Sequence, residues 1–477
     1  MLYLGAGAAG SSAAHFIHKY APRALGLDIT IFERSAHVGG RVRFTNVRGD
    51  PLLSTETGAS AFHEDDRCLN NAMRGFGLQE PDKPSLPKLR RVGVWNGRSF
   101  VFTQSENAPN SSGFTGTVWK YGLAPWRFKR LLDRYISGFH SITSLRPFAS
   151  LADEVEKSGI KAPSETRADL YLPRNDIHSP FSTEVIQAYT RARFGLNLED
   201  VNGLASFFSM EGSRPKTIAG GNWRLFDRMI RVSEAQLELN TQVTRIRRNA
   251  DRTFTLEYKL PSSNVPNVPK DDYFSHQIKT NSSSTGSESF DIVIITGPYH
   301  HADIDVVPPL QSSPPRIRYA ERHVTHFTSP QKIQPEVFGL LSNETLPEDI
   351  MTTPRYGQEP PFFSLTLIEE VRHEEQYRER TSEFLYKLVT AGPVNDNLIA
   401  KLVDAGRSSS LPTGYASWVN RQAWPYAFPM YSGLNPFMDI ELAEGLFTTA
   451  SGESLVSSME MSCLMGKKVA KSLFYTE

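Results

Sequence analysis

A glycine-rich turn lies almost at the first residue of the chain, in the stretch LYLGAGAAGSSAAHFI from Leu2 to Ile17. An apolar extended run meets Gly5, Gly7 and Gly10, and a stretch of small residues follows. This pattern predicts a strand, a tight turn and a helix. In such a unit the first glycine permits the turn, the second lets a pyrophosphate approach the backbone, and the third lets the helix pack against the strand. The sequence therefore predicts a dinucleotide-binding βα start, with a ligand-free glycine turn as the alternative.

A second signal lies in LDITIFE, which reads as a β-branched strand ending in Glu33, 23 residues after Gly10. A carboxylate at this place accepts hydrogen bonds from an adenosine ribose and repels a 2′-phosphate. The residues alone therefore disfavour NADP and leave NAD and FAD open.

Composition excludes several classes of protein. The chain has 477 residues, of which 39% are hydrophobic, and this predicts a large core and two interleaved domains. Lys plus Arg and Asp plus Glu balance at 52 each, so no basic surface for nucleic acid is expected. No window reaches the twenty apolar residues of a membrane-spanning helix.

Two cysteines, Cys68 and Cys463, give neither a disulfide framework nor a metal-ligand spacing, so no metal site is predicted and one bridge stays open. The sequons at Asn110, Asn281 and Asn343 leave a glycoprotein open.

Two further glycine loops follow the predicted ribose-binding strand. VGGR places Arg41 after Gly39 and Gly40, where it can donate to phosphates, and ETGASAFH runs from Glu56 to His63. Near the end of the chain a loop with Glu453 leads into a helix with Glu460, and the start of that helix can aim its dipole at a cofactor ring.

The remaining segments predict a divided chain. Helical spacing predicts a helix over 124–142 within a mostly helical cap that covers about 80–215. Residues 253–258 and 290–296 are predicted to form a strand pair, and the polar segment 261–288 between them is predicted to be a mobile loop.

The order of these motifs, GAGAAGSSAA, IFER, VGGR, TGAS with FH, AGGN, TQVTRI, DIVIIT and GES…SSMEMS, resembles the FAD-dependent oxidases of the amine-oxidase-like superfamily. Within it, GASAFH, YGLAPWRFKRLLDRY and above all GES…SSMEMS resemble the prenylcysteine oxidase family, also called prenylcysteine lyases. The match covers about half of the chain and is poor near 80–115, 145–185 and 310–415.

The resemblance implies an α/β (α+β) fold, a Rossmann-like FAD-binding domain of the glutathione-reductase/amine-oxidase type with an inserted, discontinuous substrate domain. The expected FAD-binding domain comprises 1–80, 216–310 and 440–477, and the expected substrate or cap domain comprises 81–215 and 311–439.

The resemblance also assigns FAD contacts by position. The pyrophosphate is expected at Gly5, Gly7, Ala8, Ala9 and Gly10. The adenosine is expected at Glu33 and Arg34 with Val243 bracketing the adenine, and the phosphate and ribityl groups at Gly40 and Arg41. The flavin ring is expected beside Gly58, Ala59 and Ser60, with Glu453 and Met459 near its ribityl chain and pyrimidine end.

The family's chemistry implies oxidation of the carbon beside the thioether sulfur of an S-prenylcysteine. A hydride leaves for the flavin, water adds, the hemithioacetal collapses to cysteine and a prenyl aldehyde, and oxygen is reduced to hydrogen peroxide. The implied partners are a small apolar substrate, such as a prenylated cysteine, and molecular oxygen. Access to substrate from a membrane surface stays open.

Two residues are candidates for catalysis. His63 can position water or move a proton near the ring, although a structural histidine is the alternative. Glu460 can tune the pyrimidine edge, and a helix cap or an ion-pair partner is its alternative.

Three rival functions stay open: an FAD oxidase of another apolar metabolite such as a terpenoid or polyketide, a nicotinamide-dependent monooxygenase, and a non-catalytic lipid-binding flavoprotein. Localisation is predicted to be lysosomal, vacuolar or secreted if a leader was removed, and cytoplasmic if Met1 is the native start.

Overall fold

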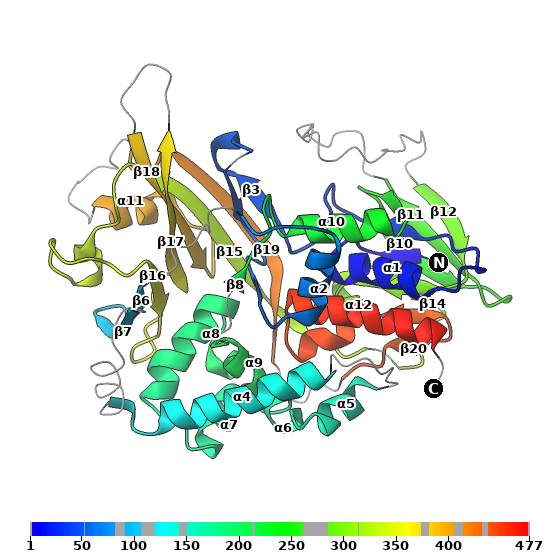
Figure 1. Cartoon of the computed structure of the whole chain (residues 1–477), viewed down its shortest axis with the longest axis horizontal. Coiled ribbons are helices and arrows are strands. Elements are labelled where there is room, and N and C mark those ends of the chain that lie inside the picture. The colour runs from blue at the N-terminus through cyan, green and yellow to red at the C-terminus, as the bar shows by residue number, and fades with distance from the viewer. Residues whose placement is uncertain are drawn as a thin grey trace.

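The computed structural model describes residues 2–51, 53–81, 91–105, 120–142, 150–211, 215–260, 285–312, 314–373, 381–404, 414–431 and 437–475. A mostly parallel sheet joins segments from both ends of the chain (Figure 1). Among the described residues its order is β20-β21-β13-β1-β2-β9, and the β20–β21 pair is antiparallel. These strands are Glu441–Ala443, Leu446–Thr448, Val293–Ile295, Leu2–Leu4, Thr30–Phe32 and Gln236–Glu238.

Three helices cover this sheet: α1 (Ala8–Tyr20), α10 (Trp223–Val232) and α12 (Met459–Phe474). The first and last lie side by side, although they come from opposite ends of the chain (Figure 1). Their close approach depends on Gly466, where a Cβ atom would lie 2.6 Å from the backbone N of Ala13. Helix α2 (Arg67–Gly75) is fastened to α12 by a disulfide between Cys68 and Cys463, the one bridge that the sequence left open.

The pairing in a smaller sheet differs from the predicted strand pair. Its order among the described residues is β12-β11-β10-β14, with bounds Thr285–Phe290, Phe254–Lys259, Gln242–Arg248 and Asp305–Val307. The partner of β11 is β12, whereas β13 (Val293–Ile295) pairs in parallel with β1. The reason lies in burial: the Val-Ile-Ile run is buried throughout, as in a parallel strand covered on both faces, while β12 alternates between exposed and half-buried residues. Most of the predicted mobile loop, 261–284, lies outside the described residues.

A larger sheet faces the parallel one across the molecule. Among the described residues its order is β19-β15-β18-β17-β16-β6-β7. The strands are Trp418–Met430, Arg318–Ser329, Thr381–Thr390, Ser364–His373, Asp349–Thr352, Arg91–Trp95 and Phe100–Ser105. The prediction of a mostly helical cap over 80–215 is wrong for β6 and β7. The two strands pair with each other in a local hairpin around Asn96-Gly97, which the prediction missed. Only the pairing of β6 with β16, 257 residues later for Val92 and Asp349, lacks a local signal.

A layer of helices lies against the larger sheet and the parallel sheet (Figure 1). It contains α4 (Ala124–Ile142), α5 (Leu151–Lys157), α6 (Lys161–Ser164), α7 (Ala168–Arg174), α8 (Gln187–Phe194) and α9 (Gly203–Phe208), and α11 (Asp396–Asp404) lies beside the larger sheet. Helix α4 has the predicted bounds and buries Phe128, Leu132 and Tyr135, with Phe128 stacked on Phe207 at 4.7 Å. Among the described residues no helix has the length and apolarity that a membrane crossing requires.

Short elements complete the fold. The strands β3 (Phe44–Asn46) and β4 (Ser54–Glu56) form one hairpin, and β5 (Phe62–His63) pairs with β8 (Pro215–Lys216). A π-helical turn, Phe181–Ile186, leads into α8. 3₁₀ turns occupy Val47–Gly49, Leu198–Asp200, Tyr299–His301, Pro335–Phe338 and Ala450–Ser454. The domain boundaries stay a prediction.

Candidate active site

A large cavity extends from the turn between β1 and α1 to the face of the larger sheet, with a volume of about 1430 Å³. A pocket for one small ligand usually measures roughly 300–1,000 Å³. This cavity therefore has room for an extended cofactor and a second molecule. Among the described residues no cluster of three or more His, Cys, Asp or Glu is arranged to hold a metal ion.

One end of the cavity is a cradle of residues that have no side chain or only a methyl group. Gly5, Gly7, Ala8 and Ala9 line it, and Gly5 has a φ of 110°, which an L residue rarely adopts. Helix α1 begins here with no capping side chain and no acidic residue in its first turn, so its N–H groups and the positive end of its dipole face the cavity. This backbone surface fits the pyrophosphate of FAD.

Gly10 contributes to the cradle by packing and is not part of its lining. A Cβ atom at this position would lie 2.0 Å from the carbonyl oxygen of Gly5 and 2.9 Å from Oγ1 of Thr296. A similar close approach involves Gly40, where a Cβ atom would lie 3.2 Å from Cα of Gly7. The loop after β2 is thereby held against the start of α1.

Glu33 lies where the adenosine ribose is expected. Its side chain is 7% exposed, and its two carboxylate oxygens accept hydrogen bonds from the N–H groups of Ala6 and Ser35, each at 2.8 Å. Each oxygen keeps a lone pair for a ribose hydroxyl. Arg34 and Val243 also line this end of the cavity, as expected for adenosine contacts.

Arg41 and Glu453, which the sequence assigned separately, lie together in the middle of the cavity. Nη2 of Arg41 is 2.5 Å from Oε1 of Glu453, and the hydroxyl of Tyr319 donates to Oε2 of Glu453 at 2.5 Å. Burial lowers the pKa of Arg41, but Glu453 outweighs this effect and raises it. The guanidinium therefore stays charged, with one carboxylate partner that the sequence did not predict.

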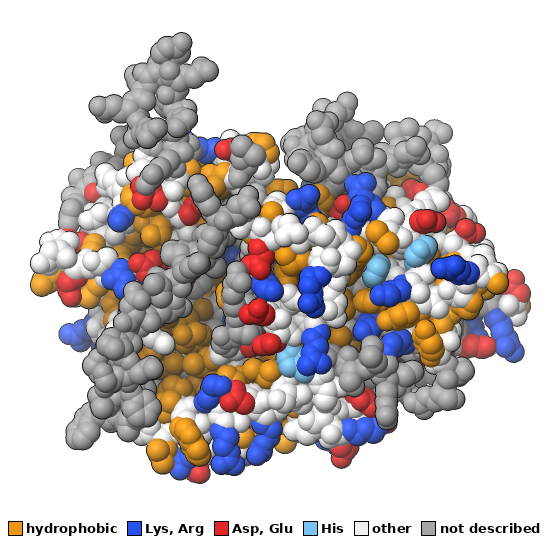
Figure 2. Space-filling view, in the orientation of Figure 1, with side chains coloured by type: hydrophobic (Ala, Val, Ile, Leu, Met, Phe, Trp, Pro, Cys, Tyr) orange, Lys and Arg blue, Asp and Glu red, His pale blue; other side chains and the backbone are white. Residues whose placement is uncertain are grey.

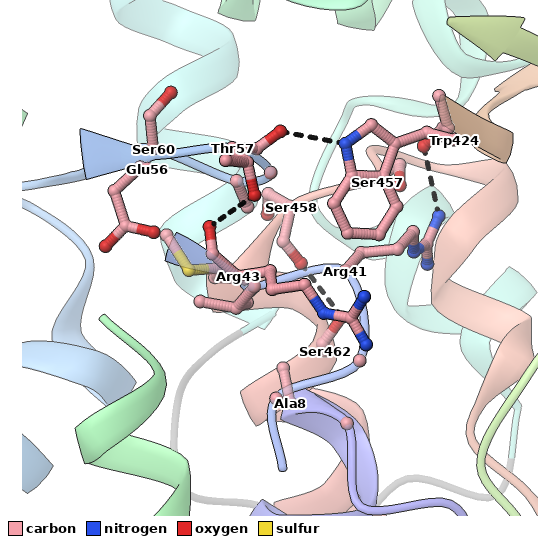
Figure 3. Close-up of a pocket in the computed structure, with 18 of the residues that line it drawn as sticks. Ala8, Arg41, Arg43, Glu56, Thr57, Ser60, Trp424, Ser457, Ser458 and Ser462 are labelled. Carbon is pink, nitrogen blue, oxygen red and sulfur yellow. Dashed lines mark hydrogen bonds between the residues drawn. The ribbon is translucent and has the colours of Figure 1, made fainter. Parts of the chain in front are cut away.

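The segment from Gly58 to Ser60 lies against an indole ring (Figure 3). Nε1 of Trp424 donates to the carbonyl of Thr57 at 2.8 Å, and a Cβ atom at Gly58 would lie 3.1 Å from Cζ2 of that ring. Met459, at the start of α12, also lines the cavity. The residues expected around the flavin ring therefore surround one space, to which Trp424 adds a flat aromatic wall.

His63 lines the cavity and is held by an arginine. Nη1 of Arg193 is 2.7 Å from Nε2 of His63, and a guanidinium only donates, so Nε2 accepts. The lone pair of Nε2 is thereby occupied by the guanidinium of Arg193. The contact therefore supports positioning by His63, and its catalytic role stays a prediction.

Glu460 lies outside the lining of the cavity, whereas Met459 and Met461 belong to it. Its side chain is 1% exposed and accepts hydrogen bonds from the N–H groups of Cys68 and Leu69, at 2.8 and 3.0 Å. These groups form the first turn of α2. These contacts favour the helix-cap alternative, and tuning of the flavin pyrimidine edge by Glu460 stays a prediction that they do not support.

This cap predicts a pH effect on stability. Burial and the neighbouring Asp66 raise the pKa of Glu460, and the two N–H donors offset the shift only in part. The folded state therefore keeps a proton that the unfolded state releases near pH 4.5, so the free energy of unfolding should fall as pH rises from there toward neutrality. Glu460→Gln should flatten this slope by up to ~1.4 kcal/mol per pH unit, measured by denaturant unfolding at several pH values.

The same variant should oxidise substrate at the wild-type rate per bound flavin, because the side chain does not reach the cavity. Glu370→Gln, at an exposed glutamate in β17, is the matched control. An unchanged pH slope, or a tenfold loss of turnover with full flavin content, would contradict the cap role.

Several cavity residues escaped the sequence analysis: Arg193, Tyr319, Glu369, Lys387 and, as an individual residue, Trp424. Apart from Arg193 on α8, they come from the larger sheet, which contains no recognisable cofactor motif. Strand alternation shows that such residues share faces, but it does not show which face meets the cofactor. For Trp424 a usable signal is the aromatic-rich segment ASWVNRQAWPYAFPMY in which it lies.

Comparisons with known proteins agree with this architecture. The prenylcysteine lyase family matches residues 113–476, and the NAD(P)-binding Rossmann-like domain matches residues 4–76. The chain is 23% identical to farnesylcysteine lyase of Arabidopsis thaliana over 488 aligned residues, which cover 98% of this chain and 86% of that protein. It is 24% identical to prenylcysteine oxidase 1-like of Bos taurus over 308 residues, 62% and 56% of the two chains.

Solved structures show the same fold at low identity. Putrescine oxidase bound to putrescine has a TM-score of 0.61 at 13% identity, and the CLA-producing fatty acid isomerase from P. acnes has 0.62 at 15%. Each comparison covers 99% of this chain and 98% of the other. The expected fold class and the resemblance stated from the motifs are thereby confirmed. The chain belongs to the prenylcysteine lyase family and is an FAD-dependent oxidoreductase.

Proposed function

We propose that this protein oxidises S-prenylcysteines at the carbon beside the sulfur. With water and molecular oxygen, the thioether becomes cysteine, a prenyl aldehyde and hydrogen peroxide. The observation that carries the proposal is the continuity of one cavity, which leads from the glycine cradle at Gly5 to the larger sheet. The curated relatives named farnesylcysteine lyase and prenylcysteine oxidase support this choice of substrate.

The residues of this chain bind and orient the two molecules. When bound, FAD supplies the hydride acceptor and the later reaction with oxygen. The backbone cradle at Gly7 holds its diphosphate and Glu33 its ribose. Apolar side chains at the other end, among them Val324, Ile368 and Phe428, line the space for a prenyl chain and exclude bulk water from it.

Peroxide and aldehyde formation test the proposal. Purified protein loaded with FAD should release both products from S-farnesylcysteine in equal amounts, together with free cysteine. Terpenoids and polyketides without a thioether should give no peroxide. Peroxide from such compounds, and none from farnesylcysteine, would move the assignment to an oxidase of another apolar metabolite.

We also propose that the protein acts in an oxidising compartment, such as a lysosome, a vacuole or the secretory route. The disulfide between Cys68 and Cys463 supports this, because such bonds persist outside the reducing cytosol. Of the sequons, Asn343 is exposed, while Asn110 and Asn281 lie outside the described residues. Protein from its native source should therefore carry the bond and a glycan at Asn343, and intact-mass analysis that finds free thiols and no glycan would contradict the proposal.

We further propose that substrate is taken from a membrane surface. Leu123, just before α4, and Trp126, in its first turn, are 60% and 62% exposed, and Arg130 lies over the indole at 5.9 Å. Figure 2 shows apolar and basic side chains side by side on the edge that the helical layer forms. An exposed tryptophan beside arginines is suited to the interface of an anionic bilayer.

Vesicle binding tests this surface. The protein should sediment with vesicles that contain phosphatidylserine and much less with pure phosphatidylcholine, and Trp126→Ser should abolish most of the binding. Tyr356→Ser, at another exposed aromatic residue, is the control. Equal sedimentation of the wild type and Trp126→Ser would contradict the proposal.

A further inference from the structure

The proposed substrate has a charged end that the apolar lining does not explain. The cysteine part carries an α-carboxylate and an α-ammonium on one carbon atom. Burying either charge without a partner costs much free energy. If the proposed function holds, the cavity must offer one cationic and one anionic side chain that are close together and not already paired.

Several charged side chains that line the cavity are already paired. Arg43 interacts electrostatically with Glu33, and Arg34 follows Glu33 in the sequence, so both belong to the adenosine end. Asp349 accepts a hydrogen bond from Thr366. Arg41 pairs with Glu453, and Arg193 donates to His63. Both oxygens of Glu33 accept backbone hydrogen bonds.

Two further charged groups are also engaged. The guanidinium of Arg322 donates to the carbonyls of Gly195 and Glu321 and lies over the Phe363 ring at 4.7 Å. Glu56 accepts the N–H of Asn222 at 2.7 Å, and its other oxygen is buried without a hydrogen-bond partner. Burial raises the pKa of Glu56 to about 8, although Lys387 interacts with it electrostatically, so the carboxyl is mostly neutral near pH 7. These side chains therefore do not offer a free charge of the required kind.

Lys387 and Glu369 differ from these groups. Nζ of Lys387 donates to the hydroxyl of Ser60 at 3.2 Å, which leaves two of its three N–H donors available. Among the described residues, the carboxylate of Glu369 has no hydrogen-bond or ion-pair partner, and burial alone raises its pKa. Both residues line the cavity.

The sheet places these two side chains near each other. Lys387 lies in β18 opposite Thr366, and Glu369 lies in β17 opposite Leu385, beyond a bulge that follows Leu367. Leu385 and Lys387 are two residues apart and share a face of β18, so Glu369 is the diagonal neighbour of Lys387. Diagonal neighbours lie about 7–8 Å apart, which long side chains can bridge through a ligand.

We propose that Lys387 and Glu369 bind the amino-acid end of the substrate, with the lysine on the α-carboxylate and the glutamate on the α-ammonium. The contact with Ser60 sets this site beside the segment expected along the flavin ring. The carbon to be oxidised is three bonds from the α-carbon of cysteine. Fixing the charged end here therefore fixes the reacting carbon within a few ångströms of the ring segment.

Substrate analogues separate the two contacts. S-Farnesylcysteamine lacks the carboxylate, and S-farnesyl-3-mercaptopropionate lacks the ammonium. Lys387→Met should raise KM for farnesylcysteine about 10- to 100-fold and leave KM for the cysteamine analogue unchanged. Glu369→Gln should raise KM for farnesylcysteine similarly and leave KM for the mercaptopropionate analogue unchanged.

Control variants test whether these effects are specific to Lys387 and Glu369. Lys401→Met, at an exposed lysine on α11, should behave as wild type, and Lys387→Arg should retain most of the preference for a carboxylate. Flavin absorbance and the melting temperature report whether each variant is folded and loaded. If Lys387→Met fails to hold flavin, Lys387→Gln and Glu369→Gln carry the test.

Two kinds of failure are distinguishable. If the wild type oxidises farnesylcysteine but the loaded variants keep its KM, or lose turnover equally on all three compounds, the assignment of the charged-end site is overturned alone. If the wild type oxidises none of the three compounds, the proposed function and this inference fall together.

Discussion

Gly10→Ala protein should purify without its yellow cofactor. The added Cβ atom would lie 2.0 Å from the carbonyl oxygen of Gly5 and 2.9 Å from Oγ1 of Thr296. The first of these is a backbone atom in the turn after β1, so it cannot rotate away. Helix α1 must then move off the sheet, and the N–H groups at Gly7 and Ala8 move with it.

The expected result is loss of most bound FAD and a lower melting temperature that added FAD does not restore. Overpacking a core typically costs ~1–3 kcal/mol, and the loss of ligand stabilisation adds to it. The ratio of flavin to protein absorbance and thermal unfolding with and without FAD measure both effects. Gly26→Ala is the matched control, because no atom lies within 4 Å of its added Cβ. Full flavin occupancy in Gly10→Ala would contradict the role assigned to Gly10.

The cofactor end of the site was predictable because its signals are local. Gly5, Gly7 and Glu33 lie in one βαβ unit, where a strand, a turn and a helix impose fixed spacings on nearby residues. Helix α4 was predictable for a similar reason, because Phe128, Leu132 and Tyr135 recur at helical spacing along one buried face. In both cases the structure depends mainly on neighbours in the sequence.

The substrate end was not predictable because it depends on long-range register. Lys387 and Glu369 meet through the pairing of β17 with β18, and a bulge decides which way Glu369 points. Trp424 reaches Thr57 across 367 residues of sequence. A single sequence contains no local pattern that fixes such contacts.

Glu460 lies on a helix that the sequence predicted, but outside the lining of the cavity. Ser458, Met461, Ser462 and Met465 line the cavity, and their spacing marks one face at the start of α12. Glu460 lies off that face and beneath α2. Glu460 and Cys463 are three residues apart, so they lie on the same face of α12, and the disulfide from Cys463 to Cys68 joins that face to α2. This spacing was the signal that could have separated the face toward α2 from the face toward the cavity.

Removal of the disulfide is expected to have the second large effect. The bond joins Cys68 and Cys463, which are 395 residues apart in the sequence, so it restricts the unfolded chain strongly. Loss of a bond that closes a long loop typically costs ~2–5 kcal/mol. The double variant Cys68→Ala/Cys463→Ala should therefore unfold several degrees below the wild type at the same FAD concentration.

Removal of the bond is also expected to affect the cofactor site. It fastens α2 to α12, and α12 lines the cavity through Met461 and Met465. Weaker FAD binding is therefore expected in the double variant, with unchanged turnover for each flavin that remains bound. A reductant should lower the melting temperature of the wild type to that of the variant and leave the variant itself unaffected. Equal melting temperatures without reductant would show that the packing of the two helices, and not the bond, holds α12 in place.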